Sequence, residues 1–230
     1  MFKSSGRQID LARDSIPGLM VKLALPSVIA QTINMLYNMV DRIYIGSIEG
    51  VGAYALTGVG LTLPVITLIS AFSSLFGTGG APLASIKLGE GKRQDAERIL
   101  GVSAFMLLCT SAVLFIFFQL AMNPLLMAFG ASENTLPYAS AYLRVYLLGT
   151  AFVQLVLGLN PFISAQGFAK EAMLSVVIGA ALNIALDPLF IFVMGMGVRG
   201  AGHDHLPGLF LPVGAALSDG QQWKDAALPE

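Results

Sequence analysis

The stretch "SVVIGAALNIALDPLFIFVMGMG", residues 175 to 197, places an acid and a proline inside a run of apolar residues. Asp187 has Asn183 four positions before it and Pro188 directly after it. A bilayer core about 30 Å thick is crossed by roughly 20 apolar helical residues, so this stretch has the length of a transmembrane helix. An acid at that depth costs at least about 2.5 kcal/mol and normally faces protein or water. The stretch therefore predicts a membrane helix with one functional face.

The rest of the chain has the same apolar character. Of its 230 residues, 55% are hydrophobic and only 12% are charged, and the mean hydropathy is +0.74. Soluble domains have about 25% charged residues. Long apolar stretches recur, without continuous strand-type alternation, which predicts an all-α integral membrane protein with a polytopic helical bundle. The expected spans are residues 17–45, 53–88, 95–122, 137–166 and 172–194.

Positive charges mark one side of the predicted membrane. Lys and Arg residues flank the first span, the loop after the second and the loop after the fourth, whereas "SIEGVG" and "NPLLMAFGASENT" contain none. The positive-inside rule then places the amino-terminal segment, residues 1–16, in the cytoplasm of a multi-pass protein of the cell inner (plasma) membrane. Because the basic residues flank loops and form no basic face, the pattern disfavours a nucleic-acid binder.

Polar residues within the spans follow helix faces. In the first span they recur at steps of three and four: Gln31, Asn34, Asn38 and Asp41. In the fifth span, Asn183 and Asp187 share a face in the same way, and in the fourth Asn160 precedes Pro161, which frees backbone groups beside it. Such residues can simply join helices by hydrogen bonds, which contribute about 0.6 kcal/mol on average. Two acids on separate helices, each accompanied by an Asn, favour a functional chamber instead.

Asp41 and Asp187 are candidates for cation coupling. Two buried carboxylates close together favour a shared proton. Sodium stays an alternative, because the two acids and the amide oxygen of Asn183 would form a hard oxygen site. No cofactor or other metal is expected. Cys109 is the single cysteine, and the pair His203 and His205 has no further ligand at fitting spacing.

Two further patterns favour a structural role. "GTGGAP", residues 77–82, lacks the Lys-Ser/Thr of a phosphate loop and favours close helix packing. Tyr138, Tyr142 and Tyr146 recur every four residues, which favours helix packing or an aromatic belt at the membrane surface.

Three stretches resemble the amino-terminal lobe of the MATE family, the multidrug and toxic compound extrusion transporters. They are "LALPSVIAQTINMLYNMVDRIYIG", "ALTGVGLTLPVITLISAFSSLFGTGGAPLASIKLGEG" and "LGLNPFISAQGFAKEAMLSVVIGAALNIALDPLFIF". The likeness covers residues 17–201, in order and spacing, and is greatest to the MepA-like and DinF-like branch. It implies five of the six helices of one lobe, which faces a second, carboxy-terminal lobe across a cleft. The implied activity is export of small-molecule drugs or toxic organic cations by a proton- or sodium-coupled antiporter, with no enzymatic reaction.

The resemblance also implies roles for individual residues. The first-helix acid of the family matches Asp41, and the fifth-helix Asn and Asp match Asn183 and Asp187, which assigns these three to cation or proton coupling. Pro26 matches a first-helix proline associated with bending, and is expected to be a hinge. The residues expected to line the substrate chamber are Asn34, Tyr37, Asn38 and Asn160.

After Ala201 the resemblance stops where a sixth helix is expected. Residues 202–230 contain three prolines and no stretch of spanning length. A one-base shift in a back-translation from His203 gives a sequence similar to the family's sixth helix, which favours a frameshift over a natural tail. We therefore expect a truncated lobe that is inactive alone.

Two other functions compete with drug export. A lipid-linked sugar flippase of the same superfamily needs a larger cationic groove than spans with only Arg144 well inside provide. A membrane enzyme needs a nucleophile paired with a base, or metal ligands, near the interface, and the only histidines lie in the non-family tail.

Overall fold

The computed structural model describes residues 16–203, and within this range every regular element is helical. The elements are α1 (Ile16–Gly46), α2 (Gly52–Gly89), α3 (Arg93–Ala128), α4 (Leu136–Leu148), α5 (Thr150–Ala165), α6 (Ala169–Pro188), the π-helical turn η1 (Leu189–Val193) and α7 (Val198–His203). Nearly all of the expected cytoplasmic segment 1–16 and of the tail 202–230 lies outside the described residues.

Helix length and apolarity confirm the prediction of a helical membrane bundle. Among the described residues, α2, α3 and the continuous helix Ala169–Val193 are long and apolar enough to cross a bilayer. A fourth span is possible if α4 and α5 together form one crossing, although they are bent by 60° relative to each other. Helix α1 has 31 residues and is not among these three helices. The fourth expected span, 137–166, is therefore two helices that meet at Gly149.

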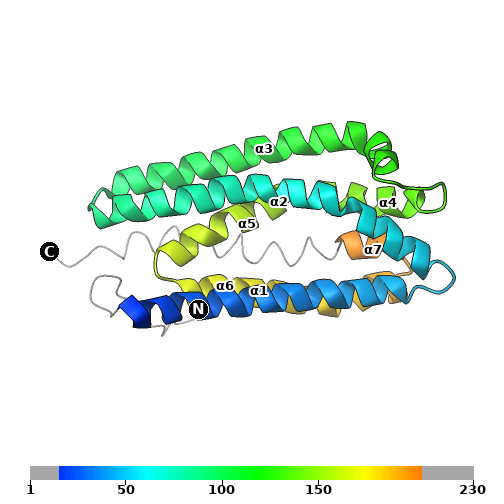
Figure 1. The fold of residues 1–230 in the computed structure, drawn as a ribbon, viewed down its shortest axis with the longest axis horizontal. Helices are drawn as coiled ribbons and strands as arrows, with labels where there is room; N and C mark the ends of the chain where they lie inside the picture. Colours follow the sequence, from blue (N-terminus) through cyan, green and yellow to red (C-terminus); the bar gives the residue numbers. More distant parts are fainter. Residues whose placement is uncertain (1–15, 204–230) are drawn as a thin grey trace.

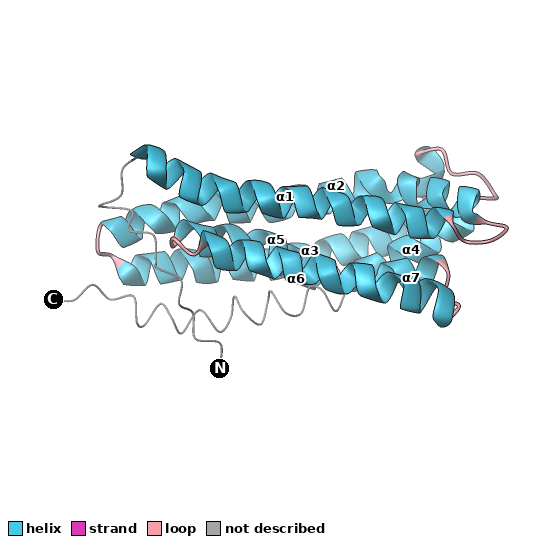
Figure 2. Ribbon diagram, turned by 90° about the horizontal axis from the view of Figure 1, so that it is seen from below, coloured by secondary structure: helices cyan, strands magenta, loops and turns pink. Residues whose placement is uncertain are grey.

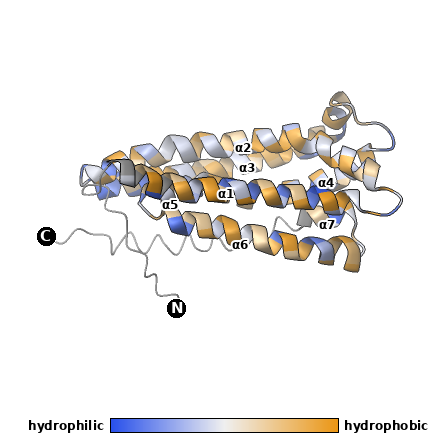
Figure 3. Ribbon diagram, turned by 60° about the horizontal axis from the view of Figure 1, so that its bottom comes forward, coloured by the Kyte–Doolittle hydropathy of each residue, from blue (hydrophilic) through white to orange (hydrophobic). Residues whose placement is uncertain are grey.

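The surface of the bundle suits a lipid solvent. Large apolar side chains such as Leu120, Met35 and Phe105 are 65–81% exposed. In water such a surface would favour association, whereas hydrocarbon tails cover it without cost. Figure 3 shows apolar residues along most of α2, α3 and α6, and hydrophilic residues at the end where α2 and α3 are joined.

The helices form a bundle in which α2 is central (Figure 1). It packs against α3 on one side and α5 on another, while α1 and α6 run side by side in the same direction (Figure 2). Helices α2 and α5 approach closely, since a Cβ atom at Gly77 would lie 2.6 Å from the Gly158 carbonyl oxygen. This contact gives the "GTGGAP" stretch the packing role that its small residues favour.

A buried polar contact fixes the same pair of helices. Gln154 of α5 has no exposed surface, and its Oε1 accepts a hydrogen bond of 3.0 Å from Ser73 Oγ of α2. Its Nε2 donates to the Ile69 carbonyl oxygen at 3.4 Å. Because a buried amide is costly without partners, these bonds specify one register of α5 on α2.

Candidate functional site

The contact between α1 and α6 brings the three predicted coupling residues together. Asp41, Asn183 and Asp187 have exposed fractions of 5%, 4% and 0%. Asp41 and Asp187 lie close enough for their charges to affect each other, although the two residues are 146 positions apart. Asn183 lies one helical turn before Asp187 on the same face of α6. The two acids therefore share one buried site at the α1–α6 interface.

The polar atoms of this site are incompletely satisfied. Within residues 16–203, Oδ1 of Asp41 and both amide atoms of Asn183 are buried without a hydrogen-bond partner. Each such group costs about 1–3 kcal/mol, and native proteins contain few of them. Unsatisfied oxygen atoms beside a second carboxylate are suited to hold a proton, a hard cation or water.

The described residues limit the kind of ion that fits. Between residues 16 and 203, no three His, Cys, Asp or Glu side chains are placed to hold a metal ion together. The oxygen atoms buried at this site belong to two carboxylates and the Asn183 amide. Oxygen ligands of this kind suit a hard cation such as sodium and do not suit a soft transition metal.

Tyrosines from two helices lie near the acids. Tyr37 of α1 and the buried Tyr142 of α4 both interact electrostatically with Asp41 and Asp187. The rings of Tyr142 and Tyr146 are stacked, with centroids 6.3 Å apart. The four-residue spacing of these tyrosines is visible in the sequence and favours packing, but it does not reveal that α4 lies beside the acids. Tyr142 is the site residue that sequence reasoning missed.

The polar residues along α1 form a stripe, and this stripe divides into two parts. An α-helix turns by about 100° per residue, so Gln31 and Asn38 lie about 20° apart around the helix axis. Asn34 and Asp41 form a second pair, which is rotated by about 60° from the first around the same axis. Asp41 is buried and Asn34 half-buried, whereas Gln31 and Asn38 are exposed. The Asn38 amide donates to the Asn34 carbonyl oxygen at 2.6 Å. The stripe thus runs from the buried site to an open face of the helix.

Asn160 lies away from the acids. Its Nδ2 donates to the Ala172 carbonyl oxygen and to Ser175 Oγ, both at 3.2 Å, and so joins α5 to the first turns of α6. Ser175 is eight residues before Asn183, which corresponds to roughly 12 Å along the helix. The structure therefore places Asn160 at a helix contact distant from the acid pair.

Two prolines lie in the helices that carry the site. Pro26 is buried inside α1, which continues as one helix through it. Pro188 directly follows Asp187 and lacks the N–H that would continue the helical pattern. The next turn, η1, is wider, and the Met194 N–H donates to the Leu189 carbonyl oxygen at 2.8 Å. Helical geometry therefore changes immediately after the acid.

Comparison with known proteins matches most of the chain. The MatE family profile matches residues 26–189, a range that contains Pro26 and Asp187. The multidrug export protein MepA of Staphylococcus haemolyticus (strain JCSC1435) is 28% identical over 81% of this chain and 41% of its own length. MepA of Staphylococcus aureus (strain MRSA252) is 30% identical over 79% of this chain and 40% of its own length. A crystal structure of MATE in complex with MaD3S superposes with a TM-score of 0.86 at 28% identity, covering 96% of this chain and 49% of that one. The chain thus spans two fifths to one half of the length of these relatives.

Proposed function

The chain belongs to the MatE family, and on this basis we propose that it forms one lobe of a cation-coupled exporter of organic, often cationic compounds. The similarity to two multidrug export proteins supports the substrate class. The coverage of about half of a related solved chain supports a partnership with a second, carboxy-terminal lobe. The chain itself is a multi-pass membrane protein.

The observation that carries the coupling proposal is the buried pair of Asp41 and Asp187. With one shared proton or one bound cation the site holds less negative charge, and without it the two carboxylates repel each other. Entry of a cation and binding of a cationic drug then compete for the same charge. One charge moving down 100 mV supplies about 2.3 kcal/mol, which sustains roughly a 45-fold gradient of one exported solute.

The exposed part of the α1 stripe supports a second lobe. Gln31 and Asn38 are exposed in this lobe, and beyond the bond from Asn38 to the Asn34 carbonyl oxygen, hydrocarbon offers their amides no hydrogen-bond partner. A water-filled cleft against another lobe would satisfy them, as alternating access around a site between two repeats requires. Tyr37 and Asn34, which are half-buried beside this face, are proposed to line the drug path.

Gradient-driven export tests the proposal. In everted vesicles that contain the chain within a two-lobe transporter, an imposed proton or sodium gradient should drive movement of the fluorescent cation ethidium. Asp41→Asn and Asp187→Asn should each abolish this movement, because they remove charge at nearly constant shape. Asp95→Asn is the matched control, since Asp95 is an exposed acid in the first turn of α3.

The two gradients are applied separately, so the assay also identifies the ion. Export at the unsubstituted rate by Asp41→Asn or Asp187→Asn, at equal protein levels in the membrane, would remove the acid pair from the mechanism. Loss of export in Asp95→Asn would show that the assay responds to any lost acid.

A further inference from the structure

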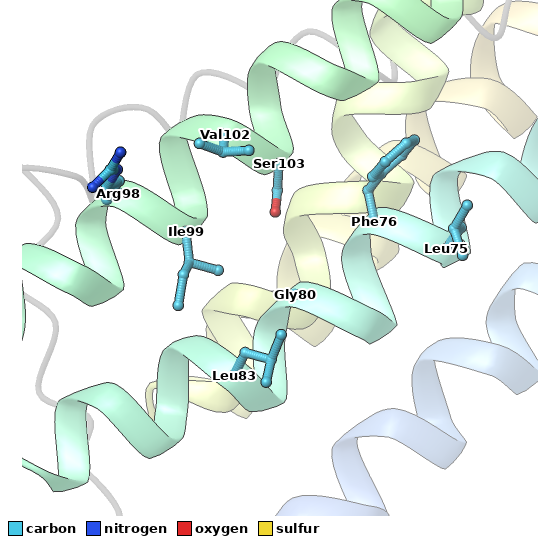
Figure 4. Close-up of a pocket in the computed structure, with 8 residues that line it drawn as sticks. All are labelled: Leu75, Phe76, Gly80, Leu83, Arg98, Ile99, Val102 and Ser103. Carbon is cyan, nitrogen blue, oxygen red and sulfur yellow. The ribbon is translucent and has the colours of Figure 1, made fainter.

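A groove of about 330 Å³ lies between α2 and α3 on the outside of the bundle (Figure 4). Its walls are mostly apolar, with Phe76 and Leu83 from α2 and Ile99 and Val102 from α3. Leu83 and Val102 are each 56% exposed, so the groove opens to the surroundings of the bundle. Its volume is at the lower end of the range of about 300–1,000 Å³ for small-molecule pockets. It can hold part of a hydrocarbon chain.

The position of charged residues shows the depth of the groove in the membrane. Residues 52–86 of α2 and 99–128 of α3 contain no charged side chain. Lys87 and Arg98 are the charged residues that border these apolar segments, at the end where the two helices are joined. The groove therefore begins at the membrane surface and extends into the hydrocarbon layer, with Arg98 at its outer end.

The basic residues Lys87, Lys92 and Arg93, where α2 and α3 are joined, are paired. Lys87 and Lys92 contact the Glu90 carboxylate at 3.0 and 2.9 Å, and hydrogen bonds from Lys92 and Lys87 hold the pKa of Glu90 below its ordinary value. Arg93 contacts Glu97 at 2.9 Å.

Arg98 differs from these neighbours. Within residues 16–203, its guanidinium forms no ion pair. The rim of the groove thus presents a positive charge that the described protein does not neutralise.

We propose that this groove is a binding site for an anionic phospholipid, with the phosphate at Arg98 and one acyl chain between α2 and α3. The guanidinium fork matches phosphate oxygens, and the apolar walls match the chain. A lipid is the occupant that a membrane surface supplies, and its negative headgroup complements the unpaired arginine. One basic residue near the surface favours an anionic lipid by about fivefold.

Native mass spectrometry of the purified full chain in detergent tests the headgroup contact. The chain is titrated with dioleoylphosphatidylglycerol and, separately, with dioleoylphosphatidylcholine. We expect the unsubstituted chain to prefer phosphatidylglycerol by about fivefold. Arg98→Gln should abolish the preference and Arg98→Lys should keep it. Arg93→Gln, which removes a paired arginine, should also keep it.

A second pair of variants tests the groove. Val102→Trp fills it and should weaken phosphatidylglycerol binding about tenfold or more, because the acyl chain loses its apolar contact. Val113→Trp adds the same ring to an exposed position of α3 outside the groove and should have no effect. Equal binding of the two lipids, a preference retained in Arg98→Gln, or unchanged binding in Val102→Trp would each overturn the proposal.

Discussion

At the scale of single residues, the acid pair could be inferred from spacing. The positions of Asn183 and Asp187 within an apolar run indicate a shared helix face, and Asp41 repeats the pattern in the first helix. Sequence spacing does not tell how helices neighbour each other. It therefore could not separate Asp41, whose charge lies near that of Asp187, from Asn160, which bonds to an earlier turn of α6. It also could not place Tyr142 beside the acids.

The role of Asn160 can be decided by one substitution. Asn160→Ala removes the hydrogen bonds to Ala172 and Ser175, and we expect a loss of about 1 kcal/mol in stability. If the chain acts in the cation-coupled export proposed above, the ratio of cations exchanged per drug should not change, because the acids are distant. Thermal unfolding in detergent measures the first quantity and ion flux the second.

Asn123→Ala is the matched control for this substitution, because Asn123 is an exposed amide on α3 and its loss should change neither quantity. If Asn160→Ala abolished exchange without lowering the unfolding temperature, Asn160 would line the drug chamber as the family resemblance implies.

At the scale of elements, apolar length predicted the helices but not their irregularities. The bend between α4 and α5 occurs at Gly149, within the sequence "LLGTAF", and a single glycine in a helical pattern is compatible with a straight helix. The π-helical turn η1 after Pro188 likewise leaves no mark in the apolar pattern of the sequence. Composition thus indicates which segments are long and apolar enough to cross a membrane, while backbone hydrogen bonding decides their shape.

The α2–α5 contact gives a prediction with an internal control. Gly77→Ala would place a methyl group 2.6 Å from the Gly158 carbonyl oxygen, and we expect a loss of about 1–3 kcal/mol in stability. Gly79→Ala, two residues further on α2, meets no atom within 4 Å and should be neutral or stabilising by up to about 1 kcal/mol. Unfolding temperatures of the two variants in the same detergent provide the comparison. Equal temperatures would mean that the two helices do not approach each other closely.

At the scale of the whole molecule, the lobe has surfaces of different character. Most of its outer surface carries exposed apolar side chains, which suit lipid, while one face of α1 carries the exposed amides of Gln31 and Asn38. The ends also differ: the α2–α3 connection is rich in Lys and Arg, and the α3–α4 connection, residues 129–135, contains neither. The two sides of a membrane also differ, and by the positive-inside rule loops rich in Lys and Arg lie on the cytoplasmic side.

This asymmetry predicts the orientation of the chain. The single cysteine, Cys109, is first replaced by alanine, and one cysteine is then introduced at Gln94 or at Asn134, both of which are exposed. These positions lie at opposite ends of α3, whose 36 residues span roughly 54 Å. In intact cells, a membrane-impermeant maleimide should label Asn134→Cys and leave Gln94→Cys unlabelled, because the basic loop stays in the cytoplasm. In permeabilised cells both cysteines should be labelled, which shows that each of them can react with the maleimide. If only Gln94→Cys were labelled in intact cells, the chain would have the opposite orientation. The Arg98 rim of the lipid groove would then lie in the outer leaflet.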